Sequence, residues 1–179
     1  MTRRFGKADW LRLGLQALAD NGPEALTIDA LCERAARTRG SFYHHFDSME
    51  AYHQALARYW RQEYTVSIIE TIETEAPGAD RQSHLNDLAL AIDPRIEQGI
   101  RRLAAINDAV AELCCEVDAE RMRYLTSLYA RSGRFDAETA EALAGIEYAA
   151  FVGFQVITPN IDVDQLQRFY QLFTKLLER

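Results

Sequence analysis

Apolar side chains recur at intervals of three and four residues along almost the whole chain, and this helical period constrains the fold more than any other feature. We find no run of alternating β-branched residues bounded by turn signals. The sequence therefore predicts an all-α protein. Capping residues and helix breakers divide it into about nine helices, over residues 7–20, 28–35, 39–45, 49–74, 80–92, 94–106, 108–132, 136–157 and 162–178.

The composition is that of a globular protein that folds unaided. The 179 residues are 48% hydrophobic with four prolines, which fits one domain, or a small domain joined to a medium one. Cys32, Cys114 and Cys115 cannot all pair within one chain, so we do not expect a disulfide framework. Charged residues interrupt the apolar stretch after the basic N-terminus, and we expect neither a signal peptide nor a membrane span. These features indicate a cytoplasmic protein.

The distribution of charge is uneven. A net charge of -7 argues at first against binding to nucleic acid, because neutralisation of phosphates supplies most of the non-specific affinity for DNA. Residues 1–50, however, hold seven Lys or Arg and seven Asp or Glu. The whole acidic excess lies in residues 51–179, and the objection does not apply to the N-terminal part.

Three short helices open the chain, with a tight break around residues 36–38 between the second and the third. This arrangement is typical of a helix-turn-helix, whose second helix enters the major groove of DNA. The stretch GSFYHHF over residues 40–46, placed before a long capped helix, resembles the DNA-binding signature of the TetR (tetracycline-repressor-like) family of bacterial regulators. The resemblance covers about residues 7–55; beyond them only the length and the number of helices match.

The resemblance implies a helix-turn-helix DNA-binding domain over residues 1–48 and a helical effector-binding and dimerisation domain over residues 49–179. It implies a homodimeric transcriptional regulator without enzymatic activity or cofactor. Such a protein would act as a repressor and would leave a palindromic operator in double-stranded DNA when it binds a small, mostly apolar effector.

The expected DNA contacts come from the starts of two helices and from the third helix. Hydroxyls at helix starts suit phosphate oxygens, and an arginine on the third helix is suited to guanine. A glycine there lets the helix backbone approach a DNA strand closely. The expected DNA-binding residues are Thr27, Arg37, Thr38, Arg39, Gly40, Ser41, Tyr43, His44 and His45, with Arg39 and Ser41 at base edges. Arg3, Arg4 and Lys7 could form an N-terminal arm.

Two departures from the family pattern affect DNA affinity more than fold. The turn holds Ala36 and Arg37 where the family usually has glycine and a β-branched residue. Met49 stands where the family usually has a lysine that contacts a phosphate. Arg37, expected to be exposed in the turn, could replace that contact.

An effector pocket, if the family pattern holds, is lined by apolar residues of the later helices. The candidates are Tyr64, Ile68, Leu88, Ile92, Ile96, Ile100, Leu113, Cys114, Phe151 and Gln155. Gln155 is the best candidate for orienting a ligand, because a buried amide needs a hydrogen-bonding partner. The alternative is that all of them are ordinary core, since apolar positions at helical spacing occur in any helical bundle.

A dimer interface is expected on the last two helices. The segment 143–157 has only Glu147 and Gln155 as polar side chains, so we expect its helix to be buried on more than one side. A stripe of small residues, Gly145, Ala149 and Gly153, permits close helix approach. The apolar stripe of the last helix consists of Val163, Leu166, Tyr170, Phe173 and Leu177. The alternative is that both helices pack within one monomer.

The sequence leaves several other functions open. Glu50 and His53 have the Glu-x-x-His spacing of di-iron bundles, but such a site needs a second copy, which the sequence lacks, so no metal is expected. Cys114 and Cys115 are either a thiol sensor or small core residues. We recognise no catalytic motif. A helical ligand-binding or adaptor protein whose helix-turn-helix no longer binds DNA, or an unrecognised helical enzyme, are the remaining alternatives.

Overall fold

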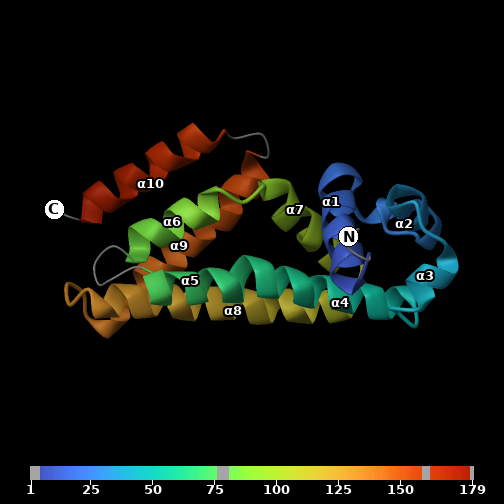
Figure 1. The fold of residues 1–179 in the computed structure, drawn as a ribbon. Helices are drawn as coiled ribbons and strands as arrows, with labels where there is room; N and C mark the ends of the chain where they lie inside the picture. Colours follow the sequence, from blue (N-terminus) through green and yellow to red (C-terminus); the bar gives the residue numbers. More distant parts are fainter. Residues whose placement is uncertain (1–4, 76–80, 159–161, 178–179) are drawn as a thin grey trace. The chain divides into compact units, whose positions relative to one another are not determined.

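The computed structural model describes residues 5–75, 81–158 and 162–177, and the elements they form are helical, without a strand (Figure 1). The elements are α1 (Lys7–Asn21), η1 (Pro23–Ala25), α2 (Ile28–Ala35), α3 (Arg39–Tyr43), α4 (Met49–Arg61), η2 (Gln62–Val66), α5 (Ser67–Glu75), α6 (Arg81–Leu90), α7 (Pro94–Ala104), α8 (Asp108–Arg131), α9 (Ala137–Ile157) and α10 (Val163–Leu177). The π-helical η2 joins α4 to α5 without a break, so the described residues form the nine α-helical segments that the sequence predicts. The all-α prediction is confirmed.

The helices group into two compact units. Unit 1 consists of Met1–Glu63 and Arg95–Val117, and unit 2 consists of Tyr64–Pro94 and Asp118–Arg179. The three borders fall inside η2, after the first residue of α7 and inside α8, so the continuous α4–α5 helix and α8 contribute to both units. Unit 1 therefore holds more than the N-terminal segment 1–48 expected as a domain, because α4, α7 and the start of α8 complete its core.

Aromatic rings form the centre of unit 1. Phe42 of α3 is fully buried, and its ring lies 5.5 Å from that of Trp10 on α1 and 5.2 Å from that of Tyr52 on α4. The Tyr52 hydroxyl donates a hydrogen bond to the Trp10 carbonyl oxygen at 2.9 Å. Phe46, 3% exposed, packs edge-on against Tyr52. Edge-to-face aromatic pairs add to the energy of apolar burial, so these rings fix α3 against α1 and α4.

Helix α7 closes unit 1 by a close approach to α1. A Cβ atom on Gly99 would lie 2.9 Å from the Leu18 Cβ and 3.1 Å from the Leu18 carbonyl group. Because real Cβ atoms do not approach other atoms so closely, only glycine lets the two helices pack at this distance. Residues 81 positions apart in sequence thereby share one core.

The turn between α2 and α3 depends on one residue in an unusual conformation. Ala36 has φ 50° and ψ 49°, in the left-handed region that favours glycine. The amide of Arg37 then donates to the carbonyl of Cys32 at 2.9 Å and closes the end of α2. The next residue, Thr38, is the N-cap of α3. The left-handed conformation is the structural reason for the glycine that the family pattern has at this turn. In this chain alanine adopts the same conformation, which lowers the stability of the fold.

A buried carboxylate lies in the core of unit 2. Glu147 of α9 is 3% exposed, and its Oε2 accepts hydrogen bonds from the Tyr129 hydroxyl of α8 at 2.6 Å and from Gln82 of α6 at 3.0 Å. Burial raises the pKa of Glu147 above the ordinary glutamate value, and the two hydrogen bonds oppose this rise. The polar residue that interrupts the apolar α9 sequence thus links three helices.

The π-helical segment η2 is held by a side chain of unit 2. The guanidinium of Arg121, on α8, donates to the Thr65 hydroxyl at 2.9 Å and to the Tyr64 carbonyl at 3.2 Å. A π segment displaces backbone carbonyls from the regular hydrogen-bond pattern of a helix, and Arg121 provides a donor for one of them.

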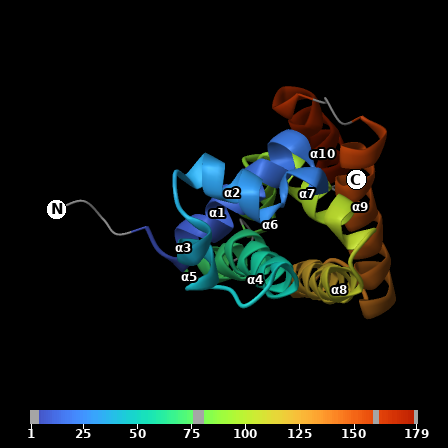
Figure 2. The same ribbon diagram turned by 90° about the vertical axis from the view of Figure 1, so that its right-hand side faces the viewer.

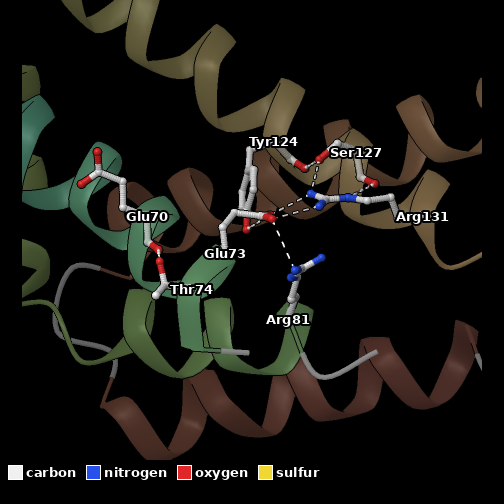
Figure 3. A network of polar contacts seen from close by, with 7 residues as sticks. All are labelled: Glu70, Glu73, Thr74, Arg81, Tyr124, Ser127 and Arg131. Atoms are coloured by element: carbon white, nitrogen blue, oxygen red, sulfur yellow. Dashed lines mark hydrogen bonds and ion pairs between the residues drawn. The ribbon is translucent and has the colours of Figure 1, made fainter. Parts of the chain in front are cut away.

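A second polar network joins α5, α6 and α8, as Figure 3 shows. Glu73 of α5 accepts hydrogen bonds from the Tyr124 hydroxyl and from Arg131, both at 2.9 Å, and Arg81 lies 3.5 Å from the same carboxylate. The hydrogen bonds and the nearby cations hold the pKa of Glu73 below its ordinary value, with the bond from Arg131 as the largest cause. Because these groups are partly exposed, the network orients the helices more than it stabilises them.

Helix α9 is the one helix among the described residues that is long and apolar enough to cross a membrane by length and composition, a feature that the sequence analysis did not expect. Its buried side, including Ala140, Ala144 and Tyr148, packs in the core of unit 2 around Tyr129. Only 28% of its most apolar stretch is buried, however. Much of this apolar helix is therefore only partly buried or exposed in the monomer.

We predict that Ala36→Gly stabilises unit 1. Alanine in the left-handed conformation is strained by roughly 1–2 kcal/mol, and glycine removes this strain. Glycine also makes the unfolded chain more flexible, which offsets part of the gain. The free energy of unfolding should therefore rise by about 0.5–1 kcal/mol. Urea denaturation followed by far-UV circular dichroism measures the change. As a control, Ala35→Gly, in the last helical position of α2, should lower the same free energy. Equal destabilisation by both substitutions would contradict the assigned role of the turn.

Candidate nucleic-acid interface

Helices α2 and α3, joined by the turn at residues 36–38, form a helix-turn-helix within unit 1 (Figures 1 and 2). The two sides of α3 differ in exposure. Phe42 faces the aromatic core, whereas its neighbour Tyr43 is 51% exposed. Arg39, Gly40 and His44 are exposed as well. A short helix anchored by one buried ring therefore presents its other side to the surroundings.

The structure places all nine sequence-predicted DNA-binding residues in this part of unit 1. Thr27, Arg37, Thr38, Arg39, Gly40, Tyr43 and His44 are exposed, and Ser41 and His45 are partly exposed. None of the nine is buried in the core, so each has surface through which it could contact a partner. Arg3 and Arg4 lie outside the described residues.

The two threonines begin the two helices. The Thr27 hydroxyl oxygen accepts from the Ala30 amide at 3.2 Å, and the Thr38 hydroxyl oxygen accepts from the Ser41 amide at 3.3 Å. Each hydroxyl therefore caps its helix as an acceptor, and its own hydrogen is directed elsewhere. An exposed O–H group beside free helix amides can donate to a phosphate oxygen.

Arg39 is paired within the unit, and sequence reasoning did not identify its partner. Its Nε donates to Asp29 Oδ1 at 2.7 Å and its Nη2 donates to Asp29 Oδ2 at 2.6 Å. The hydrogen bond from Arg39 holds the pKa of Asp29 below its ordinary value. Asp29 lies in the first turn of α2 and Arg39 in the first turn of α3, so the pair joins the starts of the two helices.

The other basic side chains of this region lie against aromatic rings or acidic groups. The Arg37 guanidinium lies 5.2 Å from the centre of the Phe5 ring and donates to the Ala36 carbonyl at 3.1 Å. The Lys7 ammonium lies 5.4 Å from the Phe46 ring centre. Arg34 pairs with Asp20 at the end of α1. These contacts orient the cations while leaving Lys7 and Arg37 exposed.

Gly40 has no packing role in the described structure. A Cβ atom there would meet only the Thr38 hydroxyl oxygen, at 3.8 Å, which is an ordinary contact. Its backbone is not in the left-handed region, unlike that of Gly22. Glycine in a helix costs about 0.5–1 kcal/mol relative to alanine, so the reason for a glycine here lies outside the fold.

The structure does not bring the expected effector-binding residues into one unit. Ile96, Ile100, Leu113 and Cys114 belong to unit 1, whereas Tyr64, Ile68, Leu88, Ile92, Phe151 and Gln155 belong to unit 2. Ile100 is fully buried and Cys114 is 5% exposed, as expected of core residues. Gln155 is 5% exposed in the apolar α9.

The last two helices correct part of the expectation for the dimer interface. Leu166 and Tyr170 are 8% and 9% exposed because they pack with Leu90 inside unit 2, and Phe173 packs against the core around Tyr129. Leu166, Tyr170 and Phe173 thus lie on the inner side of α10. Its exposed apolar side consists instead of Phe169, Leu172 and Leu176.

The small-residue stripe of α9, in contrast, lies on the uncovered side of that helix. A Cβ atom on Gly145 or Gly153 would meet nothing within 4 Å, and Ala149 is exposed. Ile146, Val156 and Ile157 are more than half exposed beside it. We refer to these six residues, together with Phe169, Leu172 and Leu176 of α10, as the apolar face.

The metal and thiol alternatives gain no support. Within the described residues, no three or more His, Cys, Asp or Glu side chains are grouped so that they could hold a metal ion. The Glu50 carboxylate accepts hydrogen bonds from Gln54 and Asn107 instead. Cys114 is buried and Cys115 is exposed, so the two adjacent thiols lie in different environments.

The comparison with protein families agrees with this geometry. The model of the bacterial regulatory proteins of the tetR family matches residues 11–56, which run from α1 into α4 and include the whole helix-turn-helix. No curated protein gives a significant match to the chain. Residues 11–56 are therefore a helix-turn-helix DNA-binding domain of the TetR family of bacterial regulatory proteins.

Proposed function

We propose that the protein is a transcriptional repressor that binds a palindromic operator as a homodimer and is released by a small, mostly apolar effector. The observation that carries the proposal is the exposed side of α3. Gly40 serves no packing purpose there, and Tyr43 is half exposed beside it. A helix that is held by its buried ring and bare on its outer side is suited to the major groove. The protein would act in the cytoplasm and without enzymatic activity.

The residues of the helix-turn-helix divide into two roles in this proposal. Arg39 and Ser41 read base edges, since arginine is the usual partner of guanine. Thr27, Thr38, Tyr43 and His45 contact the phosphate backbone and set the register. Arg37 and His44 add contacts at the ends of α3, and Arg37 compensates for Met49, which cannot bind a phosphate.

The homodimer is proposed to form through the apolar face. Seven of its nine residues are exposed, and the two glycines beside them are partly exposed, so the two helices carry uncovered apolar surface that a partner could bury. A second copy is the occupant that fits best, because a two-fold axis doubles the recognition helices. Two α3 helices about 34–36 Å apart would read half-sites one turn apart on a palindrome.

The effector is proposed to bind among the apolar helices of unit 2. Gln155 and Glu147 are the polar groups of α9 buried there, and they would orient a ligand by hydrogen bonds. The ligand must bind the DNA-free conformation more tightly than the DNA-bound one, because otherwise it shifts no population.

One observation favours a second function, that of a helical ligand-binding or adaptor protein that no longer binds DNA. The expected base-reading side chain, Arg39, is already paired with an acidic neighbour, and Met49 replaces a phosphate contact. A protein of this kind would retain the apolar face and the effector but select no DNA sequence.

We predict that the protein enriches a palindromic sequence from a pool of random duplexes, and that Gly40→Ala weakens binding to the enriched duplex at least tenfold. The added methyl group separates the α3 backbone from the DNA strand, while helix propensity raises the stability of the free protein by up to about 1 kcal/mol. Fluorescence anisotropy and thermal unfolding measure the two effects.

As a control, Thr126→Ala should also raise helix propensity but leave DNA affinity unchanged, because Thr126 lies inside α8, outside both the helix-turn-helix and the apolar face. No enrichment of any sequence would favour the second function. Unchanged affinity of the Gly40→Ala variant would remove α3 from the interface.

We predict that Leu172→Lys converts a dimer into a monomer at micromolar concentration, because it places a charge in the centre of the apolar face. Sedimentation velocity distinguishes the two states. Gln171→Lys, on the polar side of the same helix, adds the same charge and should remain dimeric. A monomeric wild-type protein, or a dimeric Leu172→Lys variant, would refute this interface.

A further inference from the structure

The ion pair between Asp29 and Arg39 has a geometry that leaves part of the arginine open to DNA. A guanidinium group can bind two acceptors side by side through its Nε and Nη2 edge or through its Nη1 and Nη2 end. Asp29 occupies the first edge, with both contacts at 2.6–2.7 Å. The Nη1 end is directed away from this carboxylate. That end has the shape needed to donate to the O6 and N7 atoms of guanine.

The stability of the fold does not account for this pair. The side chains of Arg39 and Asp29 are 64% and 74% exposed, and exposed ion pairs contribute little to folding. Asp29 also interacts with the N-terminus of α2, but an acidic residue there needs no arginine opposite it. The two-point contact is of use only if the orientation of the guanidinium matters.

Orientation matters when an arginine must read a base. A free arginine side chain samples many rotamers, and fixing it on DNA costs entropy that weakens binding. An arginine held at two points by a carboxylate loses less freedom on binding, and its end edge is aimed before the DNA arrives. The carboxylate also repels phosphates, so any placement of Arg39 on the backbone instead of a base is disfavoured.

We infer that Asp29 is a positioning residue that makes Arg39 selective for guanine, at some loss of affinity for DNA in general. This inference rests on the proposed function, since it requires that α3 reads DNA. Asp29 itself need not touch a base. Its effect is transmitted through the guanidinium that it holds.

The test compares binding to three duplexes: the one enriched from the random pool, the same duplex with one guanine replaced by adenine at each position in turn, and a duplex of unrelated sequence. Arg39→Ala first identifies the guanine that Arg39 reads. Asp29→Asn keeps the size of the side chain and removes its charge. We expect the preference for that guanine to fall about 3- to 10-fold, a part of the discrimination that one bidentate contact provides. Binding to the unrelated duplex should become tighter, because one negative charge is lost.

Two controls separate positioning from charge. Glu33→Gln removes the same charge one turn further along α2, from a side chain that is not the partner of Arg39 in this pair, and should leave the guanine preference intact. In an Arg39→Ala background, Asp29→Asn should no longer change the preference. Circular dichroism confirms that each exposed-site variant is folded.

The outcomes distinguish this inference from the proposed function. Suppose that the wild-type protein selects a sequence. If Asp29→Asn then keeps the full guanine preference, or lowers it equally in the Arg39→Ala background, the positioning role of Asp29 is overturned. The DNA-reading role of α3 stands in either case. If the wild-type protein selects no sequence, the proposed function and this inference fall together. Loss of preference only when Arg39 is present supports the inference.

Discussion

The buried ring of Phe42 is the contact on which the functional surface depends. Helix α3 has only five residues, too few to be stable alone, and its position comes from the packing of Phe42 against Trp10 and Tyr52. Tyr52 is itself fixed by its hydrogen bond to the Trp10 carbonyl. Every exposed residue of α3 therefore owes its direction to a core contact on the opposite side of the same helix.

Two aspartates of unit 1, in a chain with a net charge of -7, are paired with arginines at short range. Asp20 pairs with Arg34 and Asp29 with Arg39, and in each case the hydrogen bond from arginine holds the carboxyl pKa below its ordinary value. Such pairs cancel much of the long-range attraction to DNA. A domain of this kind gains its affinity from shape and from specific contacts more than from a general positive field.

Local features of the fold could be predicted from the sequence, and those that depend on distant residues could not. The caps at Thr27, Thr38 and Ser48 are readable because each hydroxyl bonds an amide three positions later. The π segment could not be predicted in this way, because Arg121, which donates a hydrogen bond to Thr65, lies 56 positions later in the sequence. Helix α10 carries apolar residues on two sides, and periodicity alone does not say which side is covered within the monomer. The Asp29–Arg39 pair likewise requires the fold of the turn to be known.

The most direct test of the account follows backbone amides during a titration with duplex DNA. At physiological salt, proteins that bind DNA bind unrelated sequences with dissociation constants on the order of 10⁻⁴ to 10⁻⁶ M, and more tightly at lower salt, so no operator is needed. In ¹H–¹⁵N correlation spectra, the account predicts that the largest shifts fall on Thr27 and on residues 37–45, and that raising the salt concentration reverses them. Maximal shifts outside unit 1, or no shifts at any duplex concentration, would contradict it.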